Sequence, residues 1–161
     1  MAADFVSHSP TWPEHLLPGA LRFSHSSGRY EETVAFYRDV VGLPVLGDFS
    51  ASFGEDGTIF GLPDHGVHLE IVRSTDSQPP VDRLEQLVFY LSGAEAVAAA
   101  TRRLRAADVP TDPEPHPYWV ARRADVHLDP DGRRVVFAPW VFGEELEPGE
   151  EAGRLPSEDS E

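Results

Sequence analysis

Apolar side chains recur at helical spacing within residues 30–43. Tyr30, Val34, Tyr37 and Val41 follow one another at intervals of four, three and four residues, with a glycine directly after the last of them. This spacing places all four side chains on one face of a helix. The pattern predicts an amphipathic helix over residues 30–43 that ends at this glycine and packs one face against an apolar surface.

Short runs of apolar residues alternating with polar ones surround this helix. Leu21 and Phe23 alternate with polar neighbours in the run that precedes it. Alternation with a period of two is typical of a strand that buries one face. The predicted strands of the first half cover residues 21–25, 47–53, 58–62 and 68–72.

The second half repeats this order more loosely. An apolar run at residues 86–91 leads into an Ala-rich helix that ends near Ala107, and a loop with four prolines follows at 109–117. Two strands are then predicted at 119–128 and 133–141, joined by the turn sequence Asp-Pro-Asp-Gly at 129–132. The repeat predicts two copies of one strand-helix-strands unit.

Three segments carry a resemblance to a known family. They are the helix sequence at 31–43, His-Leu-Glu-Ile at 68–71, and Asp-Pro-Asp-Gly with the strand after it at 129–137. In these segments the chain resembles the vicinal-oxygen-chelate superfamily, which includes glyoxalase I, bleomycin-resistance proteins and extradiol dioxygenases. The resemblance implies an α+β fold, in which two βαβββ modules form a curved mixed sheet around a cavity and the helices lie outside.

The predicted organisation places both modules between less regular ends. A polar, Pro-containing stretch separates two halves of similar length, and the last residues hold eight acids against one arginine. The predicted segments are an irregular arm at 1–19, a first module at 20–73, a linker at 74–83, a second module at 84–142 and a disordered acidic tail at 143–161.

Composition excludes several functions. The net charge of -15 argues against nucleic acid and anionic membranes as partners, because phosphate binding relies on a basic face. The chain contains no cysteine, which excludes disulfides, thiolate catalysis and iron–sulfur clusters. No apolar run is long enough to span a bilayer, so the predicted location is the cytoplasm.

The resemblance also implies four positions for metal ligands. In metal-using relatives these hold mostly His, Gln or Glu, and here they fall on Arg22, Glu70, Gln86 and Val136. Arginine stays protonated and offers no lone pair, and valine has no donor atom. The prediction is therefore no metal and no other cofactor.

In this interpretation the positive charge of Arg22 replaces the charge of the metal ion. Its guanidinium is expected to make a two-pronged contact with Glu70 on a neighbouring strand. Two interpretations of this pair remain open. Either it only stabilises the fold, or Glu70 holds Arg22 so that it binds a carboxylate, phosphate or enolate of a ligand.

Further residues are expected to line the cavity around this pair. A mostly apolar and aromatic lining with a few hydrogen-bonding groups suits a small-molecule pocket, although ordinary sheet packing explains some of the same positions. The predicted lining residues are Arg22, Ser24, Phe60, His68, Glu70, Gln86, Val88, Tyr90, Tyr118 and Trp119.

Among the histidines, His68 shares a strand face with Glu70 and is the candidate general base, unless it is a hydrogen-bonded structural residue. His127 is predicted on a solvent-facing strand. The calcium-like spacing of Asp125, Asp129 and Asp131 lacks the remaining ligands, so these are interpreted as turn acids.

Three functional hypotheses follow. The preferred one is a metal-independent protein that binds a small anionic or aromatic molecule, and the resemblance implies a homodimer. The second is an enzyme, either metal-dependent through His68, Glu70 and Gln86, or cofactor-free, with Arg22 stabilising an enolate while Glu70 or His68 moves a proton. The third is a scaffold with a filled core. Because all three hypotheses remain open, the sequence leaves undecided whether the protein is an enzyme.

Overall fold

The computed structural model describes residues 15, 19–62, 65–77 and 80–141. The predicted tail at 143–161 and most of the predicted arm lie outside the described residues.

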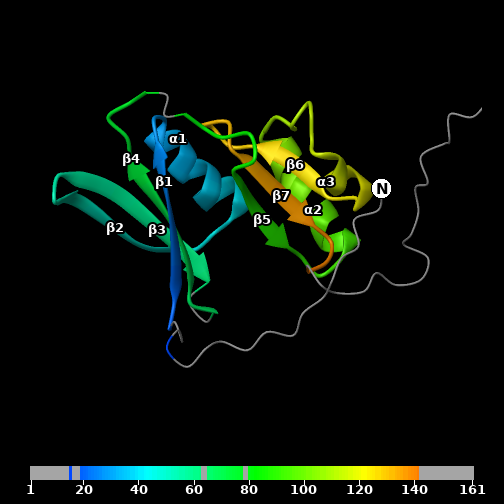
Figure 1. Ribbon diagram of the computed structural model, residues 1–161, viewed down its shortest axis with the longest axis horizontal. Coiled ribbons are helices and arrows are strands. Elements are labelled where there is room, and N and C mark those ends of the chain that lie inside the picture. The colour runs from blue at the N-terminus through cyan, green and yellow to red at the C-terminus, as the bar shows by residue number, and fades with distance from the viewer. Residues whose placement is uncertain (1–14, 16–18, 63–64, 78–79, 142–161) are drawn as a thin grey trace, which may run out of the picture.

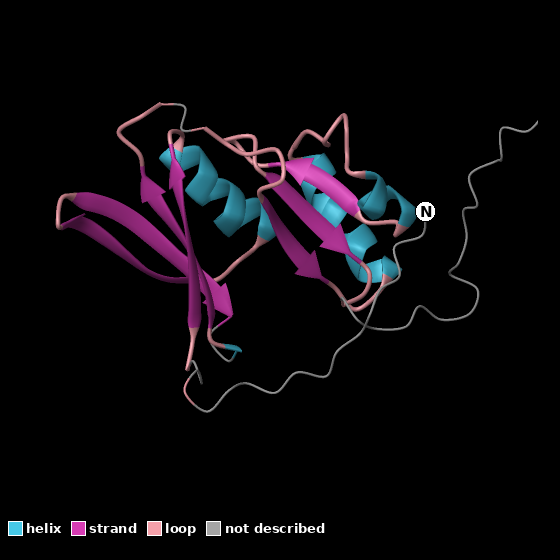
Figure 2. Ribbon diagram, in the orientation of Figure 1, coloured by secondary structure: helices cyan, strands magenta, loops and turns pink. Residues whose placement is uncertain are grey.

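The first module contains a four-stranded sheet and one continuous helical segment (Figures 1 and 2). Strand β1 runs parallel to β4, whereas β4, β3 and β2 pair antiparallel in the order β1-β4-β3-β2. Its elements in chain order are β1 (Leu21–Ser27), α1 (Tyr30–Ala35), η1 (Phe36–Val41), β2 (Val45–Ser52), β3 (Glu55–Leu62) and β4 (Val67–Arg73). The four predicted strands are confirmed with small shifts at their ends.

The predicted helix at 30–43 is confirmed, but its second half is a π-helix. The wider turn bonds the amide of Gly42 to the carbonyl of Tyr37 at 3.1 Å. Gly42 then ends the segment with φ +89°, a conformation that favours glycine. Phe36 and Tyr37 are buried on the face that the apolar spacing predicted.

The second module has a three-stranded sheet in the order β5-β7-β6, with β5 parallel to β7. Its elements are β5 (Gln86–Tyr90), α2 (Ala94–Ala106), α3 (Pro117–Ala121), β6 (Asp125–Leu128) and β7 (Arg134–Ala138). The prediction of one strand over 119–128 is wrong in its first half, which is helical. Pro117 suits the first helical position, and Nδ1 of His116 caps the helix by accepting from the Tyr118 amide at 3.2 Å.

The fourth strand of the second module is reduced to a single bridge. Thr111 pairs with His127, and the Leu128 amide donates to the Pro110 carbonyl at 3.0 Å. This segment lies at the edge where β2 lies in the first module. Proline supplies no amide hydrogen, which limits further pairing in this Pro-rich segment. The α+β class with mixed sheets is therefore confirmed, while one strand of the predicted second βαβββ unit is vestigial.

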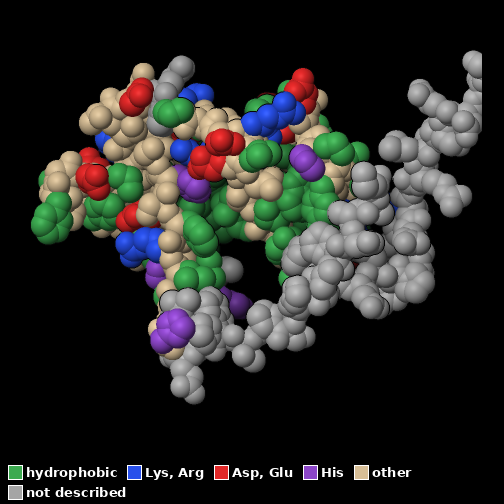
Figure 3. All heavy atoms as spheres, viewed as in Figure 1, with side chains coloured by type: hydrophobic (Ala, Val, Ile, Leu, Met, Phe, Trp, Pro, Cys, Tyr) green, Lys and Arg blue, Asp and Glu red, His purple; other side chains and the backbone are tan. Residues whose placement is uncertain are grey.

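A shared hydrophobic core joins the two modules. Phe36 and Tyr37 from η1 belong to the same buried cluster as Leu104 of α2 and Val135 and Phe137 of β7. Helix α1 lies between the two sheets in Figure 1. In Figure 3, hydrophobic side chains gather between the sheets and over the second module. The helical sides of both sheets therefore face each other within one chain.

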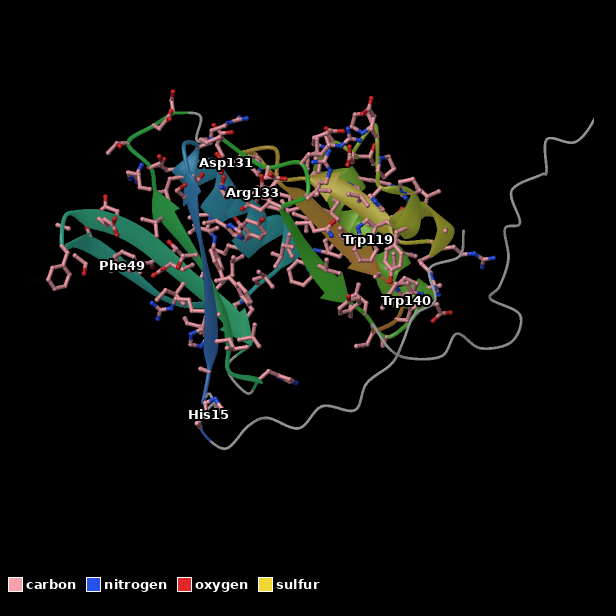
Figure 4. The ribbon with its side chains drawn as sticks, in the orientation of Figure 1. His15, Phe49, Trp119, Asp131, Arg133 and Trp140 are labelled. Atoms are coloured by element: carbon pink, nitrogen blue, oxygen red, sulfur yellow. The ribbon has the colours of Figure 1, made fainter. Side chains whose placement is uncertain are left out.

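The turn at 129–132 fastens the modules together. Asp131, whose side chain is 3% exposed, accepts hydrogen bonds from the Thr33 hydroxyl at 2.9 Å and the Gly28 amide at 3.2 Å. Arg133 donates to the Ser26 carbonyl at 2.8 Å, and Figure 4 places Asp131 and Arg133 at the junction of the sheets. The predicted turn acid Asp131 is therefore also a contact between modules.

His127 corrects a prediction about strand orientation. It is fully buried, with its ring 6.3 Å from that of Phe137, and is not on a solvent-facing strand. Its register partner Val135 belongs to the core shared by the modules, so His127 faces the same side. Burial lowers the pKa of its imidazole below the usual value.

Candidate functional site

The face of the first sheet that points away from α1 carries a charged cluster. In the register of the parallel strands β1 and β4, Ser24 lies opposite Glu70. Arg22 Nη1 lies 3.3 Å from Glu70 Oε1, and the Ser24 hydroxyl donates to Glu70 Oε2. The predicted pair is confirmed, but the two-pronged contact is not, because Ser24 occupies the second carboxylate oxygen.

The two charged groups of this pair differ in exposure. The side chain of Arg22 is 48% exposed, whereas that of Glu70 is 13% exposed. A half-exposed guanidinium held from behind by a carboxylate is well placed to donate to an arriving anion. His68 pairs opposite Arg22 and is partly buried on the same face.

Phe49 forms part of this face and was missed in the sequence. A Cβ built on Gly57 would lie 2.3 Å from Phe49 Cζ, so the ring covers the glycine directly. The pairing of Phe49 with Gly57 across β2 and β3 creates this contact. The glycine within a strand was the available signal.

Phe60 does not line this face. It is fully buried, pairs with Leu69, and its ring lies 6.2 Å from that of Tyr37 in the core. Ile59 pairs with Glu70 instead. Since neighbouring strand residues point to opposite faces, the predicted orientation of β3 was one residue out of register.

A second polar and aromatic face lies on the second sheet. Trp119 donates from Nε1 to Gln86 Oε1 at 2.9 Å, which joins α3 to β5. Val88 packs beside Trp119 in an apolar cluster distinct from the core between the modules. A pocket of about 390 Å³ opens here, and its walls include the predicted residues Gln86, Tyr90, Tyr118 and Trp119.

Two residues of this second face were not predicted. Trp140 stacks on Trp119 with ring centroids 6.4 Å apart and lies 6.1 Å from Tyr90. Arg134 lines the pocket opposite Gln86 and donates to Asp112 Oδ2 at 2.5 Å. The alternation of β7 gave a signal for Arg134, but only the packing of α3 identifies Trp140.

Apart from the buried Phe60, the predicted lining residues lie on two separate faces of this chain, which we call half-sites. Arg22, Ser24, His68 and Glu70 share the first face, and the predicted residues from β5 and α3 share the second. Figure 4 shows Phe49 on the left and Trp119 and Trp140 on the right, with the core between them. The described residues that line the pocket at the second face include none from the first face.

The residues at the four ligand positions do not fit a divalent metal. Both Glu70 oxygens already accept, from Arg22 and Ser24, and Gln86 accepts from Trp119. Val136 is fully buried and has no donor atom. A fixed cation and an apolar residue at two of four positions leave too few oxygen or nitrogen donors.

Membrane insertion through a helix finds no support in the described segments. None of the helices there combines the length and the apolar character required to cross a bilayer.

Comparison with protein families finds one match over most of the chain. Residues 22–137 match the model of the Glyoxalase/Bleomycin resistance protein/Dioxygenase superfamily. The uncharacterised protein YycE of Bacillus subtilis (strain 168) is 36% identical over 121 residues, which cover 73% of this chain and 85% of YycE.

Solved structures show the same fold. The crystal structure of YycE, a protein of unknown function, superposes with a TM-score of 0.66 at 32% identity and covers 78% of this chain and 93% of YycE. FosX, a fosfomycin resistance protein from Listeria monocytogenes, gives 0.62 at 16% identity over 79% of this chain and 96% of FosX. TnmS3, an antibiotic binding protein from Streptomyces sp. CB03234, gives 0.57 at 23% identity over 76% of this chain and 97% of TnmS3.

Proposed function

This chain belongs to the glyoxalase/bleomycin resistance protein/dioxygenase superfamily, and from that premise we propose that it is a cytoplasmic, metal-independent binding protein for a small anionic or aromatic molecule. Its cavity forms when the first face of one copy meets the second face of another. The observation that carries the proposal is the pair of half-sites, which complement each other in chemistry and point apart within one chain.

The first half-site supplies the charge. Arg22 is half exposed and oriented by Glu70, which Ser24 holds in turn. A cation fixed by the protein attracts a carboxylate or phosphate group without a metal ion. Phe49 and Ile59 give this face apolar surface beside the charge.

The second half-site supplies the aromatic wall. Tyr90, Tyr118, Trp119 and Trp140 cluster with ring centroids between 4.9 and 6.4 Å apart. Aromatic rings that are packed together offer a flat apolar surface to a planar ligand. Gln86 lies beside them with its side chain fixed by Trp119.

Two open sheet edges support assembly of two copies. In the described part of the chain β1 pairs only with β4, and β5 pairs only with β7. On β1 the apolar side chains Leu21 and Phe23 are 44% and 58% exposed. Unpaired edges with exposed apolar residues are typical of strands that a second chain covers.

Two of the structural neighbours provide parallels. FosX was crystallised with Mn(II) and a dihydroxypropylphosphonic acid, and TnmS3 is described as an antibiotic binding protein. Both of these proteins therefore bind small molecules. In this chain Arg22 stands at a position that the resemblance assigns to a metal ligand. This supports binding of a small molecule without a metal.

Assembly is tested by light scattering during size-exclusion chromatography. The expected mass is twice the 17.7 kDa of one chain, and Phe23→Asp is expected to reduce it to one chain. Arg102→Asp, an exposed change on α2, is the control and should leave the dimer intact. A monomeric wild-type protein contradicts the proposed cavity.

Ligand binding is tested by a thermal-shift screen with metals and with aromatic or phosphorylated compounds. A ligand of the native state raises the melting temperature. Arg22→Ala should abolish the shift caused by an anion that binds the proposed cavity, whereas Arg29→Ala on the surface of the same module should retain it. Stoichiometric transition metal in the purified protein would instead favour the metal-dependent enzyme.

A further inference from the structure

A separate pocket borders the aromatic cluster at Trp140. It has a volume of about 250 Å³ and is lined by α2, the end of α3 and the residues after it, the start of β6 and the residues after β7. Its floor consists of small or apolar side chains of α2, including Ala94, Val97 and Ala98. Neither half-site of the proposed cavity includes this floor.

Three arginines line this pocket in a chain with a net charge of -15. Arg105 comes from α2, whereas Arg122 and Arg123 follow α3. One acid, Asp125, also lines the pocket, with Oδ2 3.7 Å from Arg105 Nη2. Most of the ionisable side chains around the pocket are therefore positive, although acids outnumber bases in the chain by 28 to 13.

Trp140 forms one wall of the pocket and connects it to the second half-site. The Arg122 guanidinium lies 5.5 Å from the Trp140 ring centroid and 5.8 Å from that of Tyr118. These distances are within the range of cation–π attraction. An anion that binds the Arg122 guanidinium therefore competes with the Trp140 and Tyr118 rings, which also line the proposed cavity.

We infer that this pocket binds a small organic carboxylate, whose body packs on Trp140 and the α2 floor while its carboxylate accepts hydrogen bonds from Arg105 and Arg122. Guanidinium groups match the geometry of a carboxylate, and the small floor residues leave room for a compact body. The volume, below that of most drug-sized sites, limits the ligand to a small one. The inference does not require assembly of two copies, although Trp140 belongs to both sites.

The probe for this site is benzoate, and the matched neutral probe is benzamide. Both have the same shape, but only benzoate carries the charge that the arginines recognise. Titration calorimetry and tryptophan fluorescence of the full chain are expected to give saturable benzoate binding with a Kd on the order of 1 mM, and no benzamide binding. The fluorescence should change because Trp140 lines the pocket.

Variants with opposite expected signs make the test specific. Arg105→Gln should weaken benzoate binding by roughly tenfold, because a charge-assisted hydrogen bond is lost. Asp125→Asn should strengthen binding, because it removes the acid that competes for Arg105. Arg102→Gln on the same helix and Arg22→Gln in the proposed cavity should leave binding unchanged.

Three outcomes overturn the inference. They are the absence of saturation up to roughly 10 mM benzoate, equal binding of benzamide, and equal benzoate affinity in wild type and Arg105→Gln. If Arg22→Gln abolishes benzoate binding while Arg105→Gln does not, the probe binds the cavity proposed above, which supports that function and refutes this second site.

Discussion

The Tyr37 hydroxyl donates a 2.9 Å hydrogen bond to Oδ2 of Asp129, and both residues are buried. This bond joins the helical segment of the first module to the turn of the second. Burial, followed by the charge of Asp129, raises the pKa of Tyr37 well above its usual value, so the phenol remains a donor at ordinary pH. The other carboxylate oxygen accepts from the amides of Asp131 and Arg133.

Tyr37→Phe should lower the free energy of unfolding by about 1–3 kcal/mol, because a buried carboxylate oxygen loses its donor. Urea unfolding measures the change. A double-mutant cycle with Asp129→Asn provides the control, since the cost of Tyr37→Phe should shrink once the charge is gone. An equal cost in both backgrounds would show that the hydrogen bond is not the cause.

Stability should depend on pH through the buried His127. The unfolded imidazole takes up a proton near pH 6.5, whereas burial lowers its pKa in the folded protein. The folded state then binds fewer protons, so the free energy of unfolding should fall as pH decreases from about 7 to 5.5. Urea unfolding at several pH values tests this.

His127→Leu is the matched variant for this pH series. It should flatten the dependence, and the remaining slope should come partly from His25, whose pKa is lowered first by burial and then by Arg133. Identical slopes in wild type and His127→Leu contradict the assignment to His127.

The β2–β3 hairpin should be stabilised by changing one residue. Phe53 is fully exposed at φ +50°, followed by Gly54 at φ +90°. Positive φ at both turn positions favours Asn-Gly, so Phe53→Asn should add about 1 kcal/mol to the free energy of unfolding. Alanine, like phenylalanine, is disfavoured at positive φ, so Phe53→Ala should not raise the melting temperature. A loss of ligand binding in Phe53→Asn would instead assign the ring a role in recognition.

Replacing Arg22 by histidine should create affinity for metal ions. Arg22→His removes the fixed charge and adds a nitrogen donor beside Glu70, and a second copy brings Gln86 to the proposed cavity. Zinc is expected to raise the melting temperature of this variant by about 2 °C or more over that of the wild type. Arg29→His on the surface is the control. No zinc effect specific to Arg22→His would refute the assignment of this position.

Local patterns were sufficient for much of the first module. The apolar spacing of Tyr30, Val34 and Tyr37 predicted the buried face of the helix, because helical period and burial are linked. Gly42 marked its end. The contact between Arg22 and Glu70 was also predicted, from the positions that the resemblance assigned to these two residues, whereas the bond from Ser24 to Glu70 was not.

Local patterns failed where tertiary packing chose between alternatives. Trp119 is apolar and lies two residues after Pro117, which fits either a strand or a short helix, and the helix cap formed by His116 favoured the helix. Phe60 and Ile59 are both apolar, so periodicity left the orientation of β3 open, and packing against Tyr37 determined it.

The sequence by itself predicted the family, through three matching segments, and the main helix, through short-range apolar spacing. The resemblance then assigned Arg22 and Val136 to positions that hold metal ligands in relatives. Only the tertiary structure decided that the two half-sites point apart. That arrangement follows from the core between α1, α2 and both sheets, whose contacts join residues as distant in sequence as Tyr37 and Asp129. No local pattern specifies which faces of two modules meet, since alternation along a strand marks the face that is buried but not the element that covers it.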